Sequence, residues 1–224
     1  MDATALILDF GGVISRTIFE THRDTEKALG LPPDSLTWRG PFDPESDPLW
    51  AAMQRDEISE REYYARRTAE VSAMLDAGWT EMSQFIRAAR GADPASIVRP
   101  EAVAAINAAK RGGHKLAILS NELDLFYGAG FRDSLPLLGE FDVIYDATHT
   151  GILKPRARAY RDCLEQLSVT ANRSVFVDDQ MRNIRGAKAV GMYAIHFDVT
   201  RPAESFAEAL KNLDELKERD NAPP

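Results

Sequence analysis

The chain has 224 residues, 44% of them hydrophobic, which is enough for a sizeable core in one domain or in one domain with a smaller insert. The formal net charge of −8, with no run rich in Lys and Arg, argues against nucleic-acid binding. There is no secretory-signal pattern and no long apolar stretch, and the single cysteine, Cys163, excludes an internal disulfide. We therefore expect a cytoplasmic monomer or homodimer without a membrane or nucleic-acid partner.

The first predicted element is a strand over residues 3–10, an apolar run that ends in Asp9 and is followed by a glycine pair. The stretch 16–92 has no comparable strand, and its apolar spacing predicts amphipathic helices over 19–30, 47–57, 59–75 and 80–90. Ser59 and Glu62 have the spacing of a capping box. Residues 31–48 contain five prolines and are predicted to form a loop, because proline lacks the backbone donor of helices and sheets.

From about residue 95 onward, short apolar runs alternate with helical patterns. Strands are predicted over 115–120, 141–147, 174–179 and 192–198, and helices over 100–113, 154–167 and 181–191. With the first strand, this order predicts an α/β fold with a Rossmann-like parallel sheet between two helical layers. We expect residues 1–15 and 93–224 to form this core, and residues 16–92 to form an all-helical cap domain inserted into it.

Polar residues follow the predicted strands at the ends where parallel sheets bind ligands. These residues are Asp9, Ser120, Asn121, Lys154, Asp178 and Asp179. Each has a structural explanation by itself: a turn after the first strand, helix caps after the second and fourth, and a helix start at Lys154-Pro155. Their joint placement at one edge of the sheet favours a common site for phosphoryl chemistry.

In such a site Asp9 can attack phosphorus if the negative charge of the substrate is offset. Asp9 and the acidic pair Asp178-Asp179 could hold Mg²⁺, which prefers oxygen ligands, and Lys154 would neutralise further charge. The Ser120 hydroxyl and nearby backbone N–H groups could bind phosphoryl oxygens. The glycine pair allows the main chain to approach the substrate closely and leaves a carbonyl free for the metal.

Four segments resemble, in sequence and in order, the motifs of the haloacid dehalogenase superfamily of hydrolases. They are LILDFGGV, AILSNE, GILKPRARAY and SVFVDDQMRNIRGAKAVGM. The resemblance spans nearly the whole chain, and the helical stretch resembles the cap of glucose-1-phosphate phosphatases and of the phosphatase domain of epoxide hydrolase. It implies an Asp9 nucleophile that forms an aspartyl intermediate, with Ser120 and Lys154 binding the phosphoryl group and Asn121, Gly11 and Gly12 beside it. It also implies a Mg²⁺ site whose residues are Asp9, the Gly11 carbonyl, Asp178, Asp179 and Asn183.

Gly11 is a departure from the family pattern, because phosphatases of this family usually carry Asp there as general acid and base. The subgroup similar to glucose-1-phosphate phosphatases tolerates glycine at this position. His149, in the predicted loop before Lys154, is a candidate replacement, since histidine titrates in the range suited to proton transfer. His22, in the predicted cap, is a further candidate for substrate binding.

Three functions are compatible with these residues. A Mg²⁺-dependent phosphatase acting on a small phosphorylated metabolite is favoured by Asp178-Asp179, because two adjacent carboxylates in a metal-free cleft would repel each other. A metal-independent haloacid dehalogenase, or another C–X or C–N hydrolase that uses Asp9 at carbon, needs no acid and is consistent with Gly11. A binding or regulatory protein that kept the fold without turnover is the third.

Overall fold

The computed structural model describes residues 3–90, 94–128 and 130–219, which divide into two compact units. The first unit takes in the described residues up to Arg16, Val98–Leu123 and those from Arg132 onward. The second takes in the described residues of Thr17–Ile97 and Asp124–Phe131. The predicted domain boundary between residues 92 and 93 lies outside the described residues.

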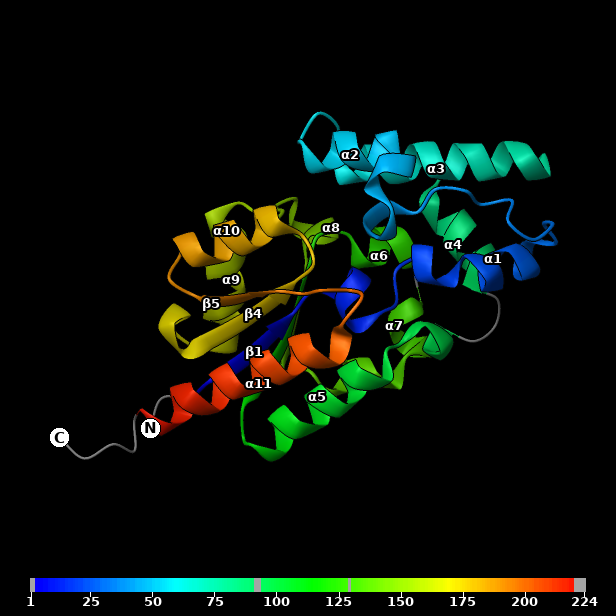
Figure 1. Cartoon of the computed structure of the whole chain (residues 1–224). Helices are drawn as coiled ribbons and strands as arrows, with labels where there is room; N and C mark the ends of the chain where they lie inside the picture. The colour runs from blue at the N-terminus through cyan, green and yellow to red at the C-terminus, as the bar shows by residue number, and fades with distance from the viewer. Residues whose placement is uncertain (1–2, 91–93, 129, 220–224) are drawn as a thin grey trace. The chain divides into compact units, whose positions relative to one another are not determined.

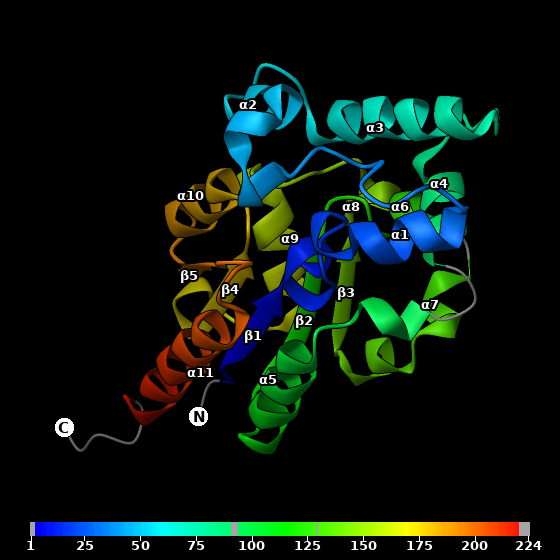
Figure 2. The same ribbon diagram turned by 45° about the vertical axis from the view of Figure 1, so that its right-hand side comes forward.

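The described part of the first unit forms a five-stranded parallel sheet in the order β3-β2-β1-β4-β5 (Figures 1 and 2). Its strands are β1 (Ala5–Leu8), β2 (Lys115–Ser120), β3 (Val143–Asp146), β4 (Ser174–Asp178) and β5 (Tyr193–His196). In β1, Ala5 pairs with Lys115 of β2 on one side and with Ser174 of β4 on the other. The first strand of the chain is therefore the central strand, and its carboxyl end lies beside those of β2 and β4.

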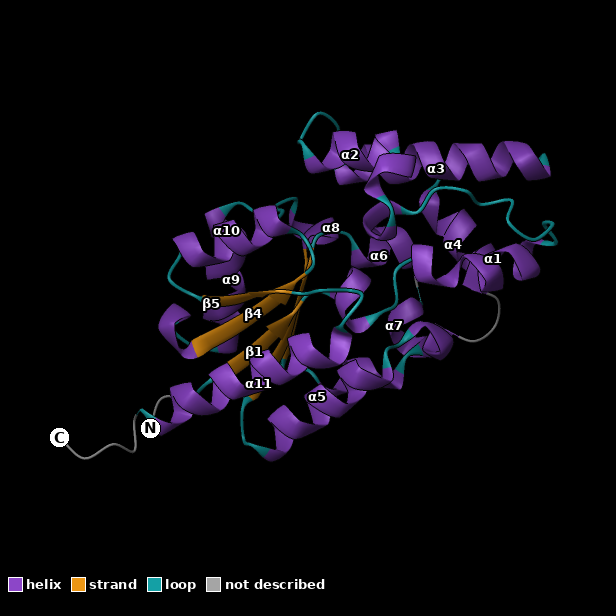
Figure 3. Ribbon diagram, viewed as in Figure 1, coloured by secondary structure: helices purple, strands orange, loops and turns teal. Residues whose placement is uncertain are grey.

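Helices cover both faces of this sheet, which explains why β1 is apolar at every position and fully buried. One face carries α5 (Pro100–Arg111) and α11 (Pro202–Glu218), and the other carries α9 (Ala157–Leu167) and α10 (Met181–Ala189) (Figure 3). In the second of these layers Tyr160 of α9 packs edge-on against Phe176 of β4, with ring centroids 5.6 Å apart. The predicted three-layer core is confirmed.

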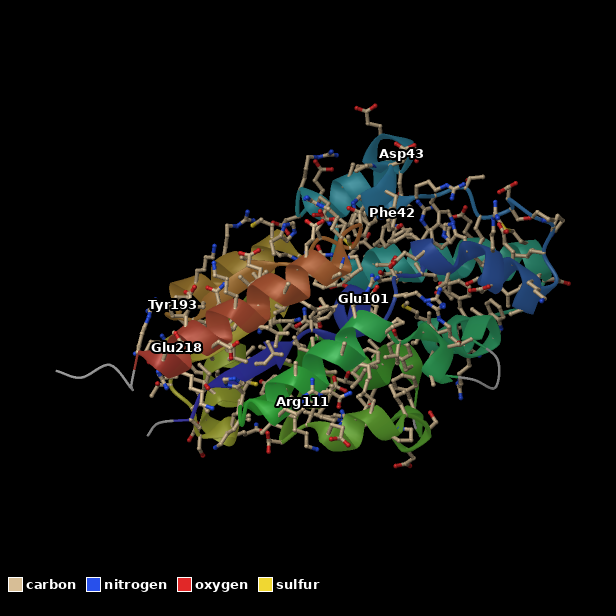
Figure 4. All side chains as sticks on the ribbon, turned by 60° about the horizontal axis from the view of Figure 1, so that its bottom comes forward. Phe42, Asp43, Glu101, Arg111, Tyr193 and Glu218 are labelled. Carbon is tan, nitrogen blue, oxygen red and sulfur yellow. The ribbon has the colours of Figure 1, made fainter. Side chains whose placement is uncertain are left out.

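Helix α11 was not predicted from the sequence pattern. Pro202 stands in its first turn, where a missing N–H breaks no helical hydrogen bond, and Phe206 and Leu213 face the core. The neighbouring α5 also begins with proline and places Glu101 in its first turn and Arg111 in its last (Figure 4). These charges oppose the helix dipole at both ends and stabilise the helix.

The second unit is helical throughout its regular structure and has its own core (Figure 2). Its helices are α1 (His22–Leu29), α2 (Pro48–Gln54), α3 (Glu60–Leu75), α4 (Met82–Arg90) and most of α6 (Leu123–Tyr127). The helices predicted over 19–90 are thus present, and the Ser59 hydroxyl caps α3 by accepting from the Glu62 N–H at 3.1 Å. Tyr63 and Phe85 are fully buried in this core.

The structure differs from the predicted elements at the start of one helix and in one predicted loop. The helix predicted from residue 154 begins at Ala157, so Pro155 lies before it rather than in its first turn. The predicted loop around His149 contains one helical turn, α8 (Ala147–Thr150), because the Asp146 carboxylate accepts from the Thr148 N–H at 2.9 Å. Two further short segments are α7 (Phe131–Ser134) and a turn over 10–14 after β1. Among the described residues, no helix has the length and apolar character of a membrane span.

Candidate active site

Two aspartates lie side by side where β1 and β4 end. Leu8 pairs with Val177, so Asp9 and Asp178 follow at the same level of the sheet. The Asp9 N–H donates to the Val177 carbonyl at 2.9 Å, and this bond extends the ladder by one residue. The strand pairing itself therefore brings the two carboxylates to one edge, as the sequence predicted.

Lys154 joins these two carboxylates. Its Nζ atom lies 2.9 Å from Asp9 Oδ1 and 2.7 Å from Asp178 Oδ2, and Lys154 and Asp178 are both buried. Burial alone would lower the pKa of Lys154, but the carboxylates of Asp178 and Asp9 outweigh it and raise that pKa. The lysine is therefore a fixed cation at neutral pH.

Asn121 determines where Lys154 stands. The Lys154 N–H donates to Asn121 Oδ1 at 2.7 Å, and Asn121 Nδ2 donates to the Lys154 carbonyl at 3.3 Å. The Asn121 side chain, just after β2, thus fixes the backbone of Lys154 through both its N–H and its carbonyl. Ser120, one residue earlier, is buried at the end of the same strand.

A second set of hydrogen bonds holds Asp178. Asn183 Nδ2 lies 3.0 Å from both carboxylate oxygens of Asp178, and the Gln180 N–H donates to Oδ1 at 2.8 Å. The Tyr160 hydroxyl donates to the Asn183 carbonyl at 2.8 Å, and burial raises the pKa of Tyr160, so this donor stays neutral. Tyr160 and Gln180 could not be singled out from the sequence, because they have no special spacing or charge.

Three carboxylates form an oxygen-rich cluster at this edge. Asp9, Asp178 and Asp179 each offer an oxygen, and these atoms lie within 4.8 Å of one another. Lys154 pairs with two of these carboxylates, those of Asp9 and Asp178. Clustered carboxylate oxygens suit a hard divalent cation, and the residues present therefore fit Mg²⁺.

The turn after Asp9 combines two glycines with different conformations. Gly11 is exposed and extended (φ −68°, ψ 126°), and a Cβ there would meet no described heavy atom within 4 Å. Gly12 has φ +78°, a value that L side chains rarely adopt. Its carbonyl accepts from Nη2 and Nε of the buried Arg99, at 3.1 and 3.3 Å. Arg99 was missed in the sequence, where it is one arginine before a helix-starting proline.

The two histidines named from the sequence have different surroundings. His149 is exposed on α8, with Nε2 4.0 Å from Asp146 Oδ2. His22 belongs to the second unit and is only 4% exposed, with its ring edge-on to Trp38 at a centroid distance of 4.4 Å. Burial, together with Arg39, lowers the pKa of His22 to about 4. Their parts in substrate binding stay predictions.

Comparison with known proteins assigns the class. Residues 3–191 match the haloacid dehalogenase-like hydrolase family, and the chain belongs to that family. This is a family of hydrolases, and the sheet edge of this member carries the acidic cluster described above.

Several proteins with curated functions are similar in sequence. Acyl-CoA dehydrogenase family member 10 of Mus musculus is 33% identical over 112 residues, which are 50% of this chain and 10% of that protein. Bifunctional epoxide hydrolase 2 of Mus musculus is 28% identical over 93% of this chain and 38% of that protein. Phosphatase MT3486 of Mycobacterium tuberculosis is 29% identical over 52% of this chain and 53% of its own length. The chain thus spans between about a tenth and about half of these relatives.

Solved structures share the fold. CbbY from Rhodobacter sphaeroides, in complex with phosphate, superposes with a TM-score of 0.55 at 22% identity over 95% of this chain and 99% of that chain. L-2-haloacid dehalogenase from Xanthobacter autotrophicus, with chloropropionic acid covalently bound, has a TM-score of 0.55 at 19% identity over 86% of this chain and 76% of that chain. A structure with phosphate bound and one with chloropropionic acid covalently bound therefore share this fold with the same TM-score.

Proposed function

We propose that this hydrolase is a Mg²⁺-dependent phosphatase that acts on a small phosphorylated metabolite through an aspartyl-phosphate intermediate on Asp9. The observation that carries the proposal is the arrangement around Asp9, whose carboxylate has a buried cation 2.9 Å away and two further carboxylates close by. The repulsion between a carboxylate and a substrate with two negative charges is offset by nearby positive charge, which Lys154 and a bound metal ion would both supply. The phosphatase relative and the phosphate-bound structural neighbour support the same class.

The residues that would hold Mg²⁺ are Asp9, Asp179 and the carbonyl of Gly11, with Asp178 beside them and Asn183 ordering the segment. When bound, the ion would act as a Lewis acid on a phosphoryl oxygen and offset the charge of the substrate. We assign Asp178 mainly to the placement of Lys154, because its oxygens already accept from Lys154, Asn183 and Gln180.

In the proposed reaction an Asp9 oxygen attacks phosphorus and the bond from phosphorus to the leaving oxygen breaks. Lys154 neutralises part of the charge on the transferred group, and Ser120 with the N–H groups of the Gly11-Gly12 turn binds its oxygens. Water then cleaves the acyl phosphate, which releases inorganic phosphate and restores Asp9. The leaving group departs as an anion or takes a proton from solvent, because Gly11 supplies none.

Reaction at carbon is the second candidate, and Gly11 is the observation that favours it. Halide departs without a proton, so the missing acid is no disadvantage in that chemistry. The proposal of a phosphatase rests on the acidic cluster, which a metal-free displacement at carbon does not need.

The test measures phosphate release from an aryl phosphate in excess Mg²⁺ and in excess chelator, with chloride release from 2-chloropropionate measured in parallel. We expect phosphate release that chelator stops and added Mg²⁺ restores, and no chloride release. Chloride release that persists in chelator would establish the dehalogenase candidate instead. Saturable phosphate binding without any turnover would identify the silent binding protein.

The variant that tests the role of Asp9 is Asp9→Asn, which keeps the shape of the side chain and removes the nucleophile. We expect turnover to fall to background, while the thermal melt changes little, because Lys154 retains Asp178 as a partner. Substantial residual activity in this variant would show that Asp9 is not the nucleophile.

A further inference from the structure

A buried aspartate ends β3, at the same edge of the sheet as the candidate site. This residue, Asp146, pairs with Ser120 of β2 in the parallel ladder, and α8 follows it directly (Figure 2). It is 4% exposed, and its side chain has no exposed surface. A carboxylate placed in such surroundings needs hydrogen-bond partners to offset its lost hydration.

The partners of this carboxylate come from two different segments. Asp146 Oδ1 accepts from the Leu123 N–H at 3.2 Å and from the Thr148 N–H at 2.9 Å. Asp146 Oδ2 accepts from Nη2 of Arg132 at 2.9 Å. One oxygen of Asp146 therefore connects the backbone that follows β2 to the backbone that follows β3.

These two segments carry the residues that contact each other beside the catalytic carboxylate. Leu123 stands two residues after Asn121, and Thr148 lies in the helical turn that leads to Lys154. Asn121 and Lys154 form the two hydrogen bonds of 2.7 and 3.3 Å described above. Asp146 thus joins the two segments at one point, and the contact between Asn121 and Lys154 joins them at another.

We infer that Asp146 is a positioning residue for Lys154, and that it acts through the two backbone N–H groups rather than through its charge. Both N–H groups share Oδ1, whereas the charged partner Arg132 binds Oδ2 and has a side chain that is 33% exposed. This role rests on the proposed function, in which Lys154 binds the transferred phosphoryl group. Displacement of such a group by about 1 Å can lower the rate by on the order of 10²-fold.

The experiment measures kcat, KM and the inhibition constant of inorganic phosphate, with an aryl phosphate as substrate in excess Mg²⁺. Asp146→Ala removes all three contacts and should lower kcat/KM, and weaken phosphate inhibition, by about tenfold or more. Asp146→Asn keeps an oxygen for both N–H groups, and both values should stay within about threefold of the wild type. Asp146→Ser can cap α8 but is too short to bind both N–H groups, so it should show a loss even if Asp146→Ala does not fold.

Asp142→Ala is the matched control for a loss of stability. Asp142 precedes β3 at the opposite edge of the sheet, and its Oδ2 atom accepts from the Leu116 N–H of β2 at 2.8 Å. The variant therefore removes a carboxylate contact between the same two strands, far from the candidate site. It should lower the melting temperature and leave kcat/KM and the phosphate inhibition constant unchanged.

Amide hydrogen exchange supplies a readout that needs no turnover. In Asp146→Ala the Lys154 N–H should exchange about tenfold faster or more relative to the amides of β1, because its hydrogen bond to Asn121 opens more often. In Asp146→Asn and in Asp142→Ala it should exchange as in the wild type.

Equal exchange of the Lys154 N–H in wild type and Asp146→Ala would overturn the positioning role. Equal losses of kcat/KM in Asp146→Asn and Asp146→Ala would show that the charge of Asp146 matters and would overturn the backbone mechanism. A wild type that releases no phosphate, together with the expected change in exchange, would contradict the proposed function and still support the placement of Lys154 by Asp146.

Discussion

Lys154 and Asp178 form an ion pair in which Nζ lies 2.7 Å from Oδ2 and neither side chain exposes more than 1% of its surface. Asp178 also accepts from Asn183 and from the backbone of Gln180. Its neighbour Asp179 is half-buried, although both belong to the same acidic cluster. The two adjacent aspartates therefore have separable tasks: one holds the buried lysine, and the other faces the proposed metal.

The first prediction contrasts these two residues. Asp178→Asn removes the fully buried partner of Lys154, which also accepts hydrogen bonds from Asn183 and Gln180. It should therefore lower the free energy of unfolding by about 3 kcal/mol, measured by urea denaturation, although the Asp9 carboxylate remains beside Lys154. Asp179→Asn should change that free energy by less than about 1 kcal/mol, and should weaken Mg²⁺ binding measured by calorimetry. If both variants are equally stable, Asp178 does not carry the structural task that its contacts indicate.

The second prediction concerns the missing acid at Gly11. Because a positioned general acid typically contributes about 10²–10⁴-fold, the wild type should cleave aryl, acyl and sugar 1-phosphates much faster than alkyl phosphates. Gly11→Asp should raise the turnover of alkyl phosphates most, and the extended, open backbone at Gly11 accepts a side chain without strain. The measurement is the slope of log kcat/KM against leaving-group pKa for both proteins.

Gly11→Asn is the control for this slope, since it adds a side chain of the same shape without an acidic proton. A flat slope for the wild type, with the chemical step shown to limit the rate, would mean that another residue already supplies the proton. His149→Ala is then the variant to test first.

The third prediction concerns Arg99, which we assign as a positioning residue for the turn after Asp9. Arg99→Met removes the donors to the Gly12 carbonyl and should lower kcat by about tenfold or more, with a weaker apparent affinity for Mg²⁺. Arg99→Lys, which retains the charge and one donor, should recover part of the loss.

Arg173→Met provides a matched control for this effect. Arg173 is also buried and also donates to a backbone carbonyl, that of Leu216, but it precedes β4 at the opposite end of that strand. It should lower the melting temperature without changing kcat. If Arg99→Met and Arg173→Met reduce stability alike and leave kcat alike, Arg99 is purely structural.

The fourth prediction is a pH dependence of stability caused by His22. Its pKa in the folded protein is lowered to about 4 from an ordinary value of 6.5, so between these values the unfolded chain binds a proton that the folded chain does not. Neutral His22 therefore makes its full contribution to the free energy of unfolding above pH 6.5. This contribution is lost as the pH falls toward 4, and the loss is on the order of 2 kcal/mol at pH 5.

Free energies of unfolding at pH 7 and pH 5 check this prediction. His22→Asn should show a smaller loss between the two pH values than the wild type. Thr25→Val, a change at a fully buried polar residue of α1 that does not titrate, should keep the loss of the wild type. An unchanged pH dependence in His22→Asn would place the responsible group elsewhere.

Much of the fold could be predicted from the sequence, because the spacing of the hydrophobic residues and the length of the apolar runs distinguish buried strands from amphipathic helices. The pattern does not contain the strand order: it predicts parallel strands, but long-range pairing decides that β1 lies between β2 and β4. The helix over Pro202–Glu218 has a proline start and inward-facing Phe206 and Leu213, signals that were available in the sequence and unused.

The candidate site likewise has a part that could be predicted from the sequence and a part that could not. The meeting of Asp9, Lys154 and Asp178 was predictable, because Asp9 and Asp178 lie at the carboxyl ends of parallel strands and Lys154 lies in the segment after a third. The contact of Arg99 with Gly12 was not, since it joins residues far apart in the sequence through a side chain with no motif. Its geometry depends on how the turn after β1 folds.

The position of β1 at the centre of the sheet has a consequence for how the protein is made. Ala5 is synthesised before its partners Lys115 and Ser174, which lie far along the chain, so the two edges of the strand cannot both be paired until the segment through Ser174 has emerged. A fully apolar segment must remain unpaired during that time, in a form open to association with other chains. The strand that precedes the proposed nucleophile thus pairs late, and its long-range pairing with β4 limits how soon the sheet edge and the candidate site can form.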